Sequence, residues 1–123
     1  MDKIRIVIVD DSPFSIAILR GILEDKGYEV VGEAGTLEEV KEVIKDKRPA
    51  LVTMDMTLPG TDGFECTRAV HEIDPNIKVI VLSALENESL LGESMLTDVE
   101  VILSKDASIN EILETVYTVS KTG

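Results

Sequence analysis

The length, charge and cysteine content of this chain exclude several classes of protein. At 123 residues, the sequence is long enough for one domain that buries about two-thirds of its unfolded surface without disulfides. Its net charge of −12 repels phosphate backbones and anionic lipids, and no apolar stretch approaches the ~20 residues that span a bilayer, so we expect neither nucleic-acid nor membrane binding. A single cysteine, and a start without a signal-peptide pattern, indicate the reducing cytoplasm.

The N-terminal part predicts a strand, a helix and a second strand. Residues 4–9 form a mainly apolar run, typical of a buried parallel strand, and end in Asp10 and Asp11. The Ser-Pro pair that follows matches the start of a helix, and Gly27 matches its left-handed end. Residues 28–34 are the next strand. The helix carries an apolar stripe that we expect to face the core: Ser15, Ile18, Leu19, Ile22 and Leu23.

The middle of the chain predicts two helices around a central strand. Thr36 and Glu39 form a capping box for a helix that ends near Asp46 and turns Leu37, Val40 and Ile44 inward. Residues 51–55 form an apolar run that is too short for a helix and ends in a carboxylate. Pro and Gly follow it, which is typical of the end of a buried strand. Residues 61–63 then cap a helix that ends before Pro75 and carries Phe64, Cys66, Val70 and Ile73.

The C-terminal part repeats the alternation of strand and helix. Residues 78–82 form a buried strand tipped by Ser83, and the short segment 88–96 is a weak helix because a central glycine costs up to ~1 kcal/mol relative to alanine. Residues 99–103 form the fifth strand, followed by Lys105. A second capping box, Ser108 with Glu111, opens a last helix whose expected core stripe is Ile109, Ile112, Leu113 and Val116.

Five strand–helix pairs with short connections predict one α/β domain. Right-handed crossovers make all five strands parallel and place helices on both faces of the sheet. The carboxyl ends of parallel strands meet at one edge, so we expect five polar side chains to converge there: Asp10, Asp11, Asp55, Ser83 and Lys105. Three clustered carboxylates raise one another's pKa unless a cation lies among them, and oxygen ligands favour Mg²⁺.

This set of side chains suits phosphoryl transfer. An ionised Asp55 can attack phosphorus, and aspartyl phosphates are known intermediates. The transferred group needs its charge neutralised, which Mg²⁺, Lys105, Ser83 and backbone N–H groups can supply. No general base is required, because a carboxylate is already deprotonated at pH 7.

Four motifs, in this order and spacing, cover the chain from end to end: Val9-Asp10-Asp11-Ser12, Met54 to Phe64, Val81-Leu82-Ser83-Ala84 and Leu103-Ser104-Lys105. Together they resemble the receiver domain of two-component response regulators, of the chemotaxis-regulator type. The resemblance implies a flavodoxin-like, doubly wound fold with strand order 2-1-3-4-5. It also implies a single receiver domain over residues 1–123.

The resemblance assigns a role to each site residue. Asp55 becomes the phosphoacceptor; Asp11, Asp55 and the carbonyl of Thr57 bind Mg²⁺ directly, and Asp10 binds it through water. Ser83 and Lys105 hold the phosphoryl group. The donor is a phosphohistidine on a sensor histidine kinase or a phosphotransfer protein. The domain catalyses its own phosphorylation and dephosphorylation without being a classical enzyme, and the face of the fourth helix, fifth strand and fifth helix signals to an effector protein or domain. Phosphorylation-dependent dimerisation stays open.

Two positions depart from the family pattern. The family usually has a cis Lys-Pro bond where this chain has Lys105-Asp106, and a cis bond before a non-proline costs ~2.5–4 kcal/mol. We therefore expect either a trans bond with a reshaped loop or a strained cis bond. Ile102 also replaces the family's aromatic residue, so rotation of a buried ring cannot report phosphorylation here.

Three other functions remain as alternatives. A pseudo-receiver would keep the fold without phosphorylation, although the complete acidic set argues against it. A hydrolase of the haloacid-dehalogenase type needs a second Asp where this chain has Thr57. A flavin carrier is disfavoured because clustered carboxylates repel a flavin phosphate and no Gly-rich phosphate loop follows the first strand.

Several single residues have ordinary structural interpretations. Cys66 lies on an apolar helical stripe, which indicates packing rather than redox chemistry. His71 is expected to be a solvated helix residue without a catalytic role. Phe14, Ile16 and Ala17 lie beside the predicted site, where either edge packing or docking of kinase helices would explain them.

Overall fold

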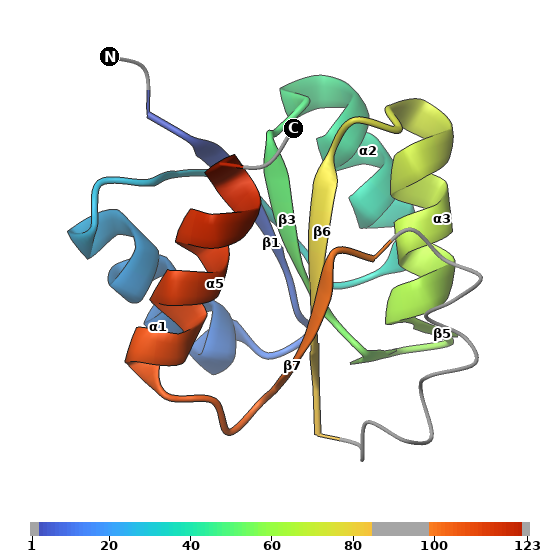
Figure 1. The fold of residues 1–123 in the computed structure, drawn as a ribbon. Coiled ribbons are helices and arrows are strands. Elements are labelled where there is room, and N and C mark those ends of the chain that lie inside the picture. Colours follow the sequence, from blue (N-terminus) through green and yellow to red (C-terminus); the bar gives the residue numbers. More distant parts are fainter. Residues whose placement is uncertain (1–2, 85–98, 122–123) are drawn as a thin grey trace.

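A computed structural model describes residues 3–84 and 99–121 of the chain (Figure 1). The helix expected over residues 88–96 lies outside the described residues. The elements are β1 (Arg5–Val9), α1 (Pro13–Asp25), β2 (Glu29–Ala34), α2 (Leu37–Lys47), β3 (Leu51–Asp55), β4 (Thr57–Leu58), β5 (Thr61–Asp62), α3 (Gly63–Ile73), β6 (Lys78–Ser83), β7 (Val101–Ser104) and α5 (Ile109–Lys121).

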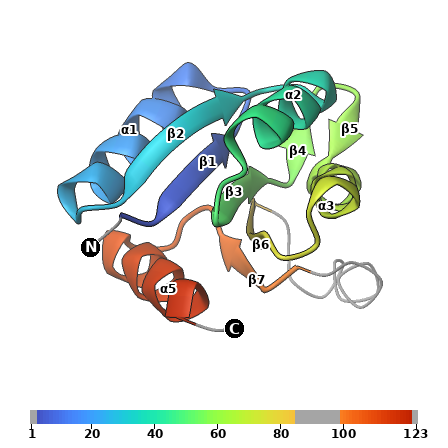
Figure 2. The ribbon, with the colours of Figure 1, turned by 90° about the horizontal axis from the view of Figure 1, so that it is seen from above.

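The main sheet has the predicted topology. Five strands pair in the order β2-β1-β3-β6-β7, and every pair is parallel. Because β6 and β7 are the fourth and fifth strands of this sheet, the order is the expected 2-1-3-4-5. Figure 2, the view from above, shows α1 and α5 on one face of the sheet and α2 and α3 on the other. The doubly wound, flavodoxin-like α/β fold is therefore confirmed.

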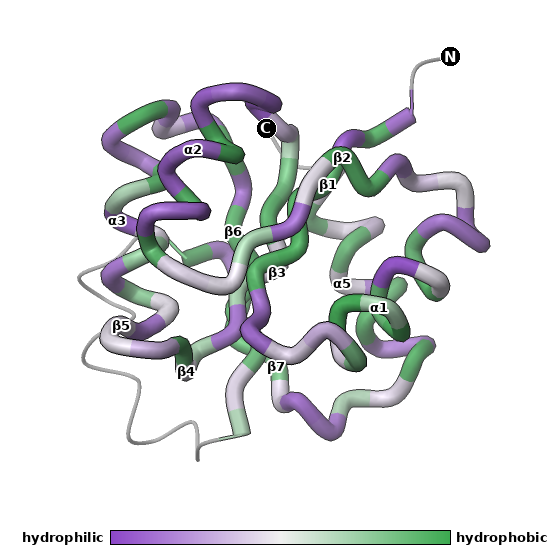
Figure 3. Tube along the Cα trace, turned by 180° about the vertical axis from the view of Figure 1, so that it is seen from behind, coloured by the Kyte–Doolittle hydropathy of each residue, from purple (hydrophilic) through white to green (hydrophobic). Residues whose placement is uncertain are grey.

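The hydrophobic core forms two layers, one on each face of the sheet. Alternate residues of each strand point to opposite faces, so Val52 and Met54 of β3 pack under α2 and α3, while Leu51 packs under α1 and α5. Figure 3 shows the hydrophobic stretches of the central strands between the helices. Each fully buried aliphatic side chain contributes about 1.5–3 kcal/mol of transfer free energy. Among the described residues, no helix is long and apolar enough to span a bilayer.

The predicted helix starts are capped by side chains. Thr36 accepts a hydrogen bond from the Glu39 N–H at 3.2 Å, and Asp62 accepts one from the Glu65 N–H at 2.8 Å. Ser12 does the same for α1, and Ser108 with Glu111 forms the reciprocal box of α5. One detail of the expected box at α2 is wrong. The Glu39 carboxylate accepts from the Gly35 N–H, one residue before the cap.

Two predicted core residues are instead exposed. Ile18 of α1 and Ile109 of α5 both face solvent. On α1 the buried positions are Leu19 and Leu23, with Ile16 packed against the same layer, so the core face is rotated away from Ile18 towards Ile16. On α5 the buried positions are Val116 and Val119, towards the C-terminal end of the helix. Helical periodicity fixes the stripe but not the angle at which the helix meets the sheet.

Two residues of α3, Cys66 and His71, were also assigned an environment from the sequence. Cys66 is fully buried in the core, as expected for a packing residue, and burial raises the pKa of its thiol. His71, predicted to be solvated, is half-buried. Its Nε2 atom lies 2.9 Å from the carbonyl oxygen of Ile77, which ties the end of α3 to the loop before β6.

Candidate functional site

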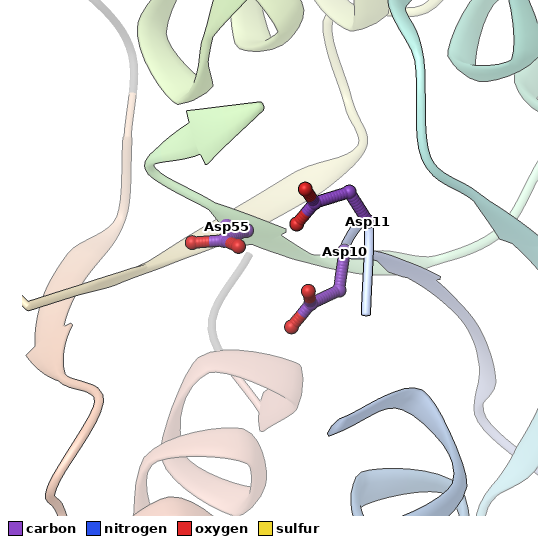
Figure 4. Close-up of side chains that lie close together, drawn as sticks. All are labelled: Asp10, Asp11 and Asp55. Carbon is purple, nitrogen blue, oxygen red and sulfur yellow. The ribbon is translucent and has the colours of Figure 1, made fainter. Parts of the chain in front are cut away.

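Three carboxylates meet at the carboxyl edge of the sheet. Asp10 and Asp11 follow β1 directly, and Asp55 ends the neighbouring strand β3 (Figure 4). Each residue offers a carboxylate oxygen, and these atoms all lie within 4.8 Å of one another. Asp10 and Asp55 are 7% and 6% exposed, whereas Asp11 is open to solvent. Two buried carboxylates and one accessible carboxylate therefore lie close enough together to bind a single cation.

Lys105 brings the only cationic side chain that the described residues place against these acids. It follows β7, in the turn before α5, and its Nζ atom lies 3.0 Å from Oδ2 of Asp55 and 3.4 Å from Oδ2 of Asp10. The ammonium group is thus held between two carboxylates that are distant in sequence. The convergence expected from the strand ends is observed for Asp10, Asp11, Asp55 and Lys105.

Burial and charge act in opposite directions on the central pair. Burial raises the pKa of Asp55, the hydrogen bond and attraction to Lys105 lower it, and Asp10 raises it again, with a net upward shift. Burial lowers the pKa of Lys105, but the hydrogen bonds and attraction to Asp55 and Asp10 outweigh it and leave the pKa raised. Asp55 therefore holds its proton to a higher pH than a fully solvated aspartate does.

The backbone after Asp55 is held in place by a short antiparallel ribbon. Strands β4 and β5 pair Thr57 with Asp62 and Leu58 with Thr61, and Gly60 provides the positive φ of 71° at the turn. The Thr57 N–H points at Oδ1 of Asp55, 3.4 Å away. Sequence periodicity did not predict this ribbon, because strands of two residues are too short to show alternation.

Gly63 allows α3 to approach the acidic residue closely. A Cβ atom at this position would lie 2.9 Å from the carbonyl oxygen of Asp55, closer than real Cβ contacts allow. The Gly63 N–H donates to the carbonyl of Met56 at 2.8 Å, and the buried Thr67 hydroxyl donates to the carbonyl of Gly63 at 2.6 Å. Sequence analysis did not single out this glycine. The feature of the sequence that could have identified it is its position directly after Asp62, the N-cap residue of α3.

Ser83 lies at the same edge of the sheet. It ends β6, next to β3, and its side chain is buried. Its carbonyl accepts a hydrogen bond from the N–H of Lys105 at 2.9 Å, so the two residues are fixed relative to each other. All five strand-end residues that the sequence predicted therefore lie along one edge.

The loop after β7 resolves the question of the Lys105-Asp106 bond. No peptide bond of the described residues is cis, so this one is trans. Ser104 closes a turn here: its hydroxyl accepts from the Asp106 N–H at 3.0 Å, and its carbonyl accepts from the Ala107 N–H at 3.0 Å. Of the two expected states of this bond, the trans state is the one observed.

Fold and site together define a class of protein, a doubly wound α/β domain with an acidic, lysine-containing centre at its carboxyl edge. Residues 6–117 match the family described as the response regulator receiver domain. The chain therefore belongs to the receiver domains of two-component response regulators, in which a phosphoryl-accepting Asp and a Mg²⁺ site are general features. Members of this family are signalling phosphoacceptors rather than classical enzymes, so membership decides against the dehalogenase-type hydrolase and the flavin carrier.

Individual relatives cover almost the whole chain. The chemotaxis protein CheY of Thermotoga maritima is 35% identical over 117 residues, which are 95% of this chain and 98% of that protein. The signal receiver domain of the response regulator NarL from Mycobacterium tuberculosis superposes with a TM-score of 0.91 at 27% identity, covering 100% of both chains. In a complex of CheX, CheY, BeF₃ and Mg²⁺ from Borrelia burgdorferi, the matched chain has a TM-score of 0.88 at 29% identity, covering 96% of this chain and 90% of that one.

Proposed function

We propose that residues 1–123 act as one cytoplasmic receiver domain in which Asp55 takes a phosphoryl group from a phosphohistidine. The donor is a sensor histidine kinase or a phosphotransfer protein. The observation that carries this proposal is the position of Lys105, 3.0 Å from Asp55 and 3.4 Å from Asp10. A cation against a buried acceptor favours the ionised carboxylate that attacks phosphorus, and it supplies charge for the incoming group.

The donor set fits Mg²⁺. Its ligands are hard oxygen atoms, and the three carboxylates lie close enough to share one ion. Asp11, Asp55 and the Thr57 carbonyl would bind the ion directly, and Asp10 through water. Bound there, Mg²⁺ would neutralise charge on the phosphoryl oxygens.

The chain's own residues carry the transfer. An Asp55 oxygen forms the new bond to phosphorus while the bond to the histidine nitrogen breaks, and the imidazole leaves with the electron pair of that bond. The ammonium of Lys105 and the hydroxyl of Ser83 hold the transferred group, and the Thr57 N–H lies beside the acceptor carboxylate. Later attack by water on phosphorus releases inorganic phosphate and restores Asp55. Both steps are catalysed by this domain.

The start of α1 is the proposed docking site for the donor's helices. Phe14 is largely exposed one turn from Asp11, and Ile16 lines an open hollow of about 440 Å³ that also reaches Asp10 and Asp11. An apolar side chain of the donor can be buried there while its histidine faces the acceptor. Output passes to an effector protein or domain through the face that includes β7 and α5, without an aromatic switch because Ile102 occupies that position.

Intact-mass measurement after incubation with Mg²⁺ and acetyl phosphate tests the proposal. We expect one added phosphoryl group, absent in Asp55→Asn and present in Asp46→Asn, which removes an exposed carboxylate of α2 instead. Labelling of Asp55→Asn would contradict the assignment.

Magnesium titration separates this proposal from a pseudo-receiver. We expect binding in the millimolar range or tighter, followed by NMR, and its loss in Asp11→Ala. A chain that neither binds Mg²⁺ nor takes up phosphate is a pseudo-receiver.

A further inference from the structure

Glu39 makes an unusual hydrogen bond at the start of α2. At α5, where the capping box has its expected form, the Glu111 carboxylate accepts from the N–H of the capping residue itself, Ser108, at 3.4 Å. Glu39 occupies the same helix position, three residues after its cap Thr36, but its Oε1 atom accepts from the Gly35 N–H at 2.8 Å. This bond therefore reaches past the helix and holds the turn between β2 and α2.

The turn that Glu39 holds lies directly against the acidic pair after β1 (Figure 4). The Asp10 N–H donates to the carbonyl of Ala34 at 2.9 Å, which continues the pairing of β1 with β2. A Cβ atom added to Gly35 would lie 3.3 Å from the carbonyl oxygen of Asp10 and 3.5 Å from Cα of Asp11. A side chain at this position would have to push the backbone of Asp10 away, so the turn and the acidic pair pack as one unit.

Asp11 depends on this backbone for its position. Its side chain is exposed, and no residue of the ranges 3–84 and 99–121 forms a hydrogen bond or ion pair with its carboxylate. The Asp10 carboxylate, in contrast, accepts from the Ser12 N–H at 2.9 Å and lies 3.4 Å from Lys105. Mg²⁺ demands near-ideal octahedral geometry, so a ligand whose carboxylate is not held by neighbours must be placed by its backbone.

We propose that Glu39 is a positioning residue for the Mg²⁺ site and acts through the Gly35 N–H. The bond holds the turn against Asp10 and Asp11, so these two residues are in place before the ion arrives and less ordering is needed on binding. Glu39 acts without touching the ion, because the described carboxylates close enough to share one cation are those of Asp10, Asp11 and Asp55. The inference rests on the proposed function, since it requires Mg²⁺ at these acids.

The charge of Glu39 is a competing explanation for any effect on the metal. Glu39 lines the same open hollow of about 440 Å³ as Asp10 and Asp11, where a further negative charge attracts cations. The two explanations make opposite predictions for Glu39→Gln, since an amide oxygen still accepts from the Gly35 N–H but carries no charge. Glu39→Ala removes both the bond and the charge.

Magnesium titrations of the full chain, followed by NMR of the backbone N–H groups, test the proposal. We expect Glu39→Ala to raise the dissociation constant for Mg²⁺ at least about threefold, and Glu39→Gln to keep it within about twofold of the parent value. Glu38→Ala removes a neighbouring exposed charge of the same helix and should also stay within about twofold, because salt screens a charge in solvent. Weakening by Glu39→Gln or by Glu38→Ala as large as that by Glu39→Ala shows that charge acts, and it overturns the proposal.

Hydrogen exchange and urea denaturation separate positioning from a loss of helix stability. Glu39→Ala should accelerate exchange of the Gly35 N–H with solvent, because that group loses its acceptor. A variant that is less stable than the parent but binds Mg²⁺ equally well would give Glu39 a structural role alone and would overturn the proposal.

Gly35→Ala tests the contact between the turn and the acidic pair while Glu39 is left intact. The added methyl group meets the carbonyl of Asp10, so we expect the dissociation constant for Mg²⁺ to rise at least about threefold. Gly21→Ala is the control, since a Cβ there meets nothing within 4 Å. Unchanged affinity in Gly35→Ala overturns the link between the turn and the acids.

The parent chain separates this inference from the proposed function. If the parent does not bind Mg²⁺, the proposed function and the inference both fail. If the parent binds Mg²⁺ and Glu39→Ala binds it equally well, the inference alone fails.

Discussion

The two faces of the sheet differ in how completely their side chains are used for packing. Under α2 and α3, a continuous layer of buried residues includes Phe64, Ile44 and Met54, and none of the strongly exposed hydrophobic residues of the described chain belongs to these helices. Under α1 and α5, the layer contains an unpaired hydroxyl at Thr53 and a cavity of about 220 Å³ that reaches Asp10 and Lys105. One face serves stability, and the other leaves surface for contacts.

The largest effect is expected on the α2/α3 face. Ile44→Ala removes a fully buried side chain from the centre of that layer and should lower the free energy of unfolding by about 2–5 kcal/mol. Urea denaturation measures this change. A loss below about 1 kcal/mol would show that the layer relaxes around the cavity and is not tightly packed.

Gly63→Ala should lower stability by about 1–3 kcal/mol, because the added methyl group meets the Asp55 carbonyl, a backbone atom that cannot turn aside. The same change shifts α3 away from the site, so Mg²⁺ affinity should fall with stability. Gly21→Ala on α1 is the matched control, since a Cβ there meets nothing within 4 Å. Equal effects of the two substitutions would contradict the role assigned to Gly63.

Magnesium should reverse the pH dependence that Asp55 produces. Its raised pKa means that the folded state holds this proton to higher pH than the unfolded chain does, so without metal its contribution to stability is greatest at low pH and falls as pH rises through the raised pKa. Mg²⁺ at ten times its dissociation constant adds about 1.4 kcal/mol at neutral pH, because it binds the ionised folded site. Thermal unfolding at several pH values measures both effects, and Asp55→Asn should lack them. Equal Mg²⁺ stabilisation of Asp55→Asn would contradict the assigned ligand.

Thr53→Val should raise the free energy of unfolding by about 1 kcal/mol. Thr53 lies in β3 between Ile8 and Ile80, and its buried hydroxyl has no hydrogen-bond partner, so an isosteric methyl group removes a desolvation penalty. Thr53→Ser keeps the hydroxyl and is the control. Destabilisation by valine would indicate that the hydroxyl is bonded in solution.

The smallest effect is expected at an exposed position on α1, on the other face of the sheet. Ile18→Ala should change the stability of the monomer by less than about 0.5 kcal/mol, because the side chain is half exposed. Denaturation at low protein concentration measures this change. A loss comparable to that of Ile44→Ala would place Ile18 in the core.

Most of the fold was predictable because its signals are local. Ser12, Thr36, Asp62 and Ser108 each cap a helix through a hydrogen bond three residues along the chain, so a few letters suffice to predict the start. The convergence of the site followed from topology alone, since parallel strands share one carboxyl edge.

The errors concern geometry that only the assembled fold determines. Ile18 and Ile109 satisfy the helical period but lie outside the buried angle. His71 looked solvated because its partner, the Ile77 carbonyl, belongs to a later loop. The need for Gly63 arises from its contact with Asp55, eight residues earlier in the chain, which no propensity encodes. Sequence therefore predicted which residues meet, and less well how closely they pack.

The most direct test of the central claim is to locate the phosphoryl group after labelling with Mg²⁺ and acetyl phosphate. Borohydride reduces an aspartyl phosphate to homoserine, which peptide mass spectrometry assigns to a position. We predict homoserine at position 55 and at no other aspartate of the site. Homoserine at Asp10 or Asp11 instead, or a stable phosphate ester on Ser83, would contradict the account.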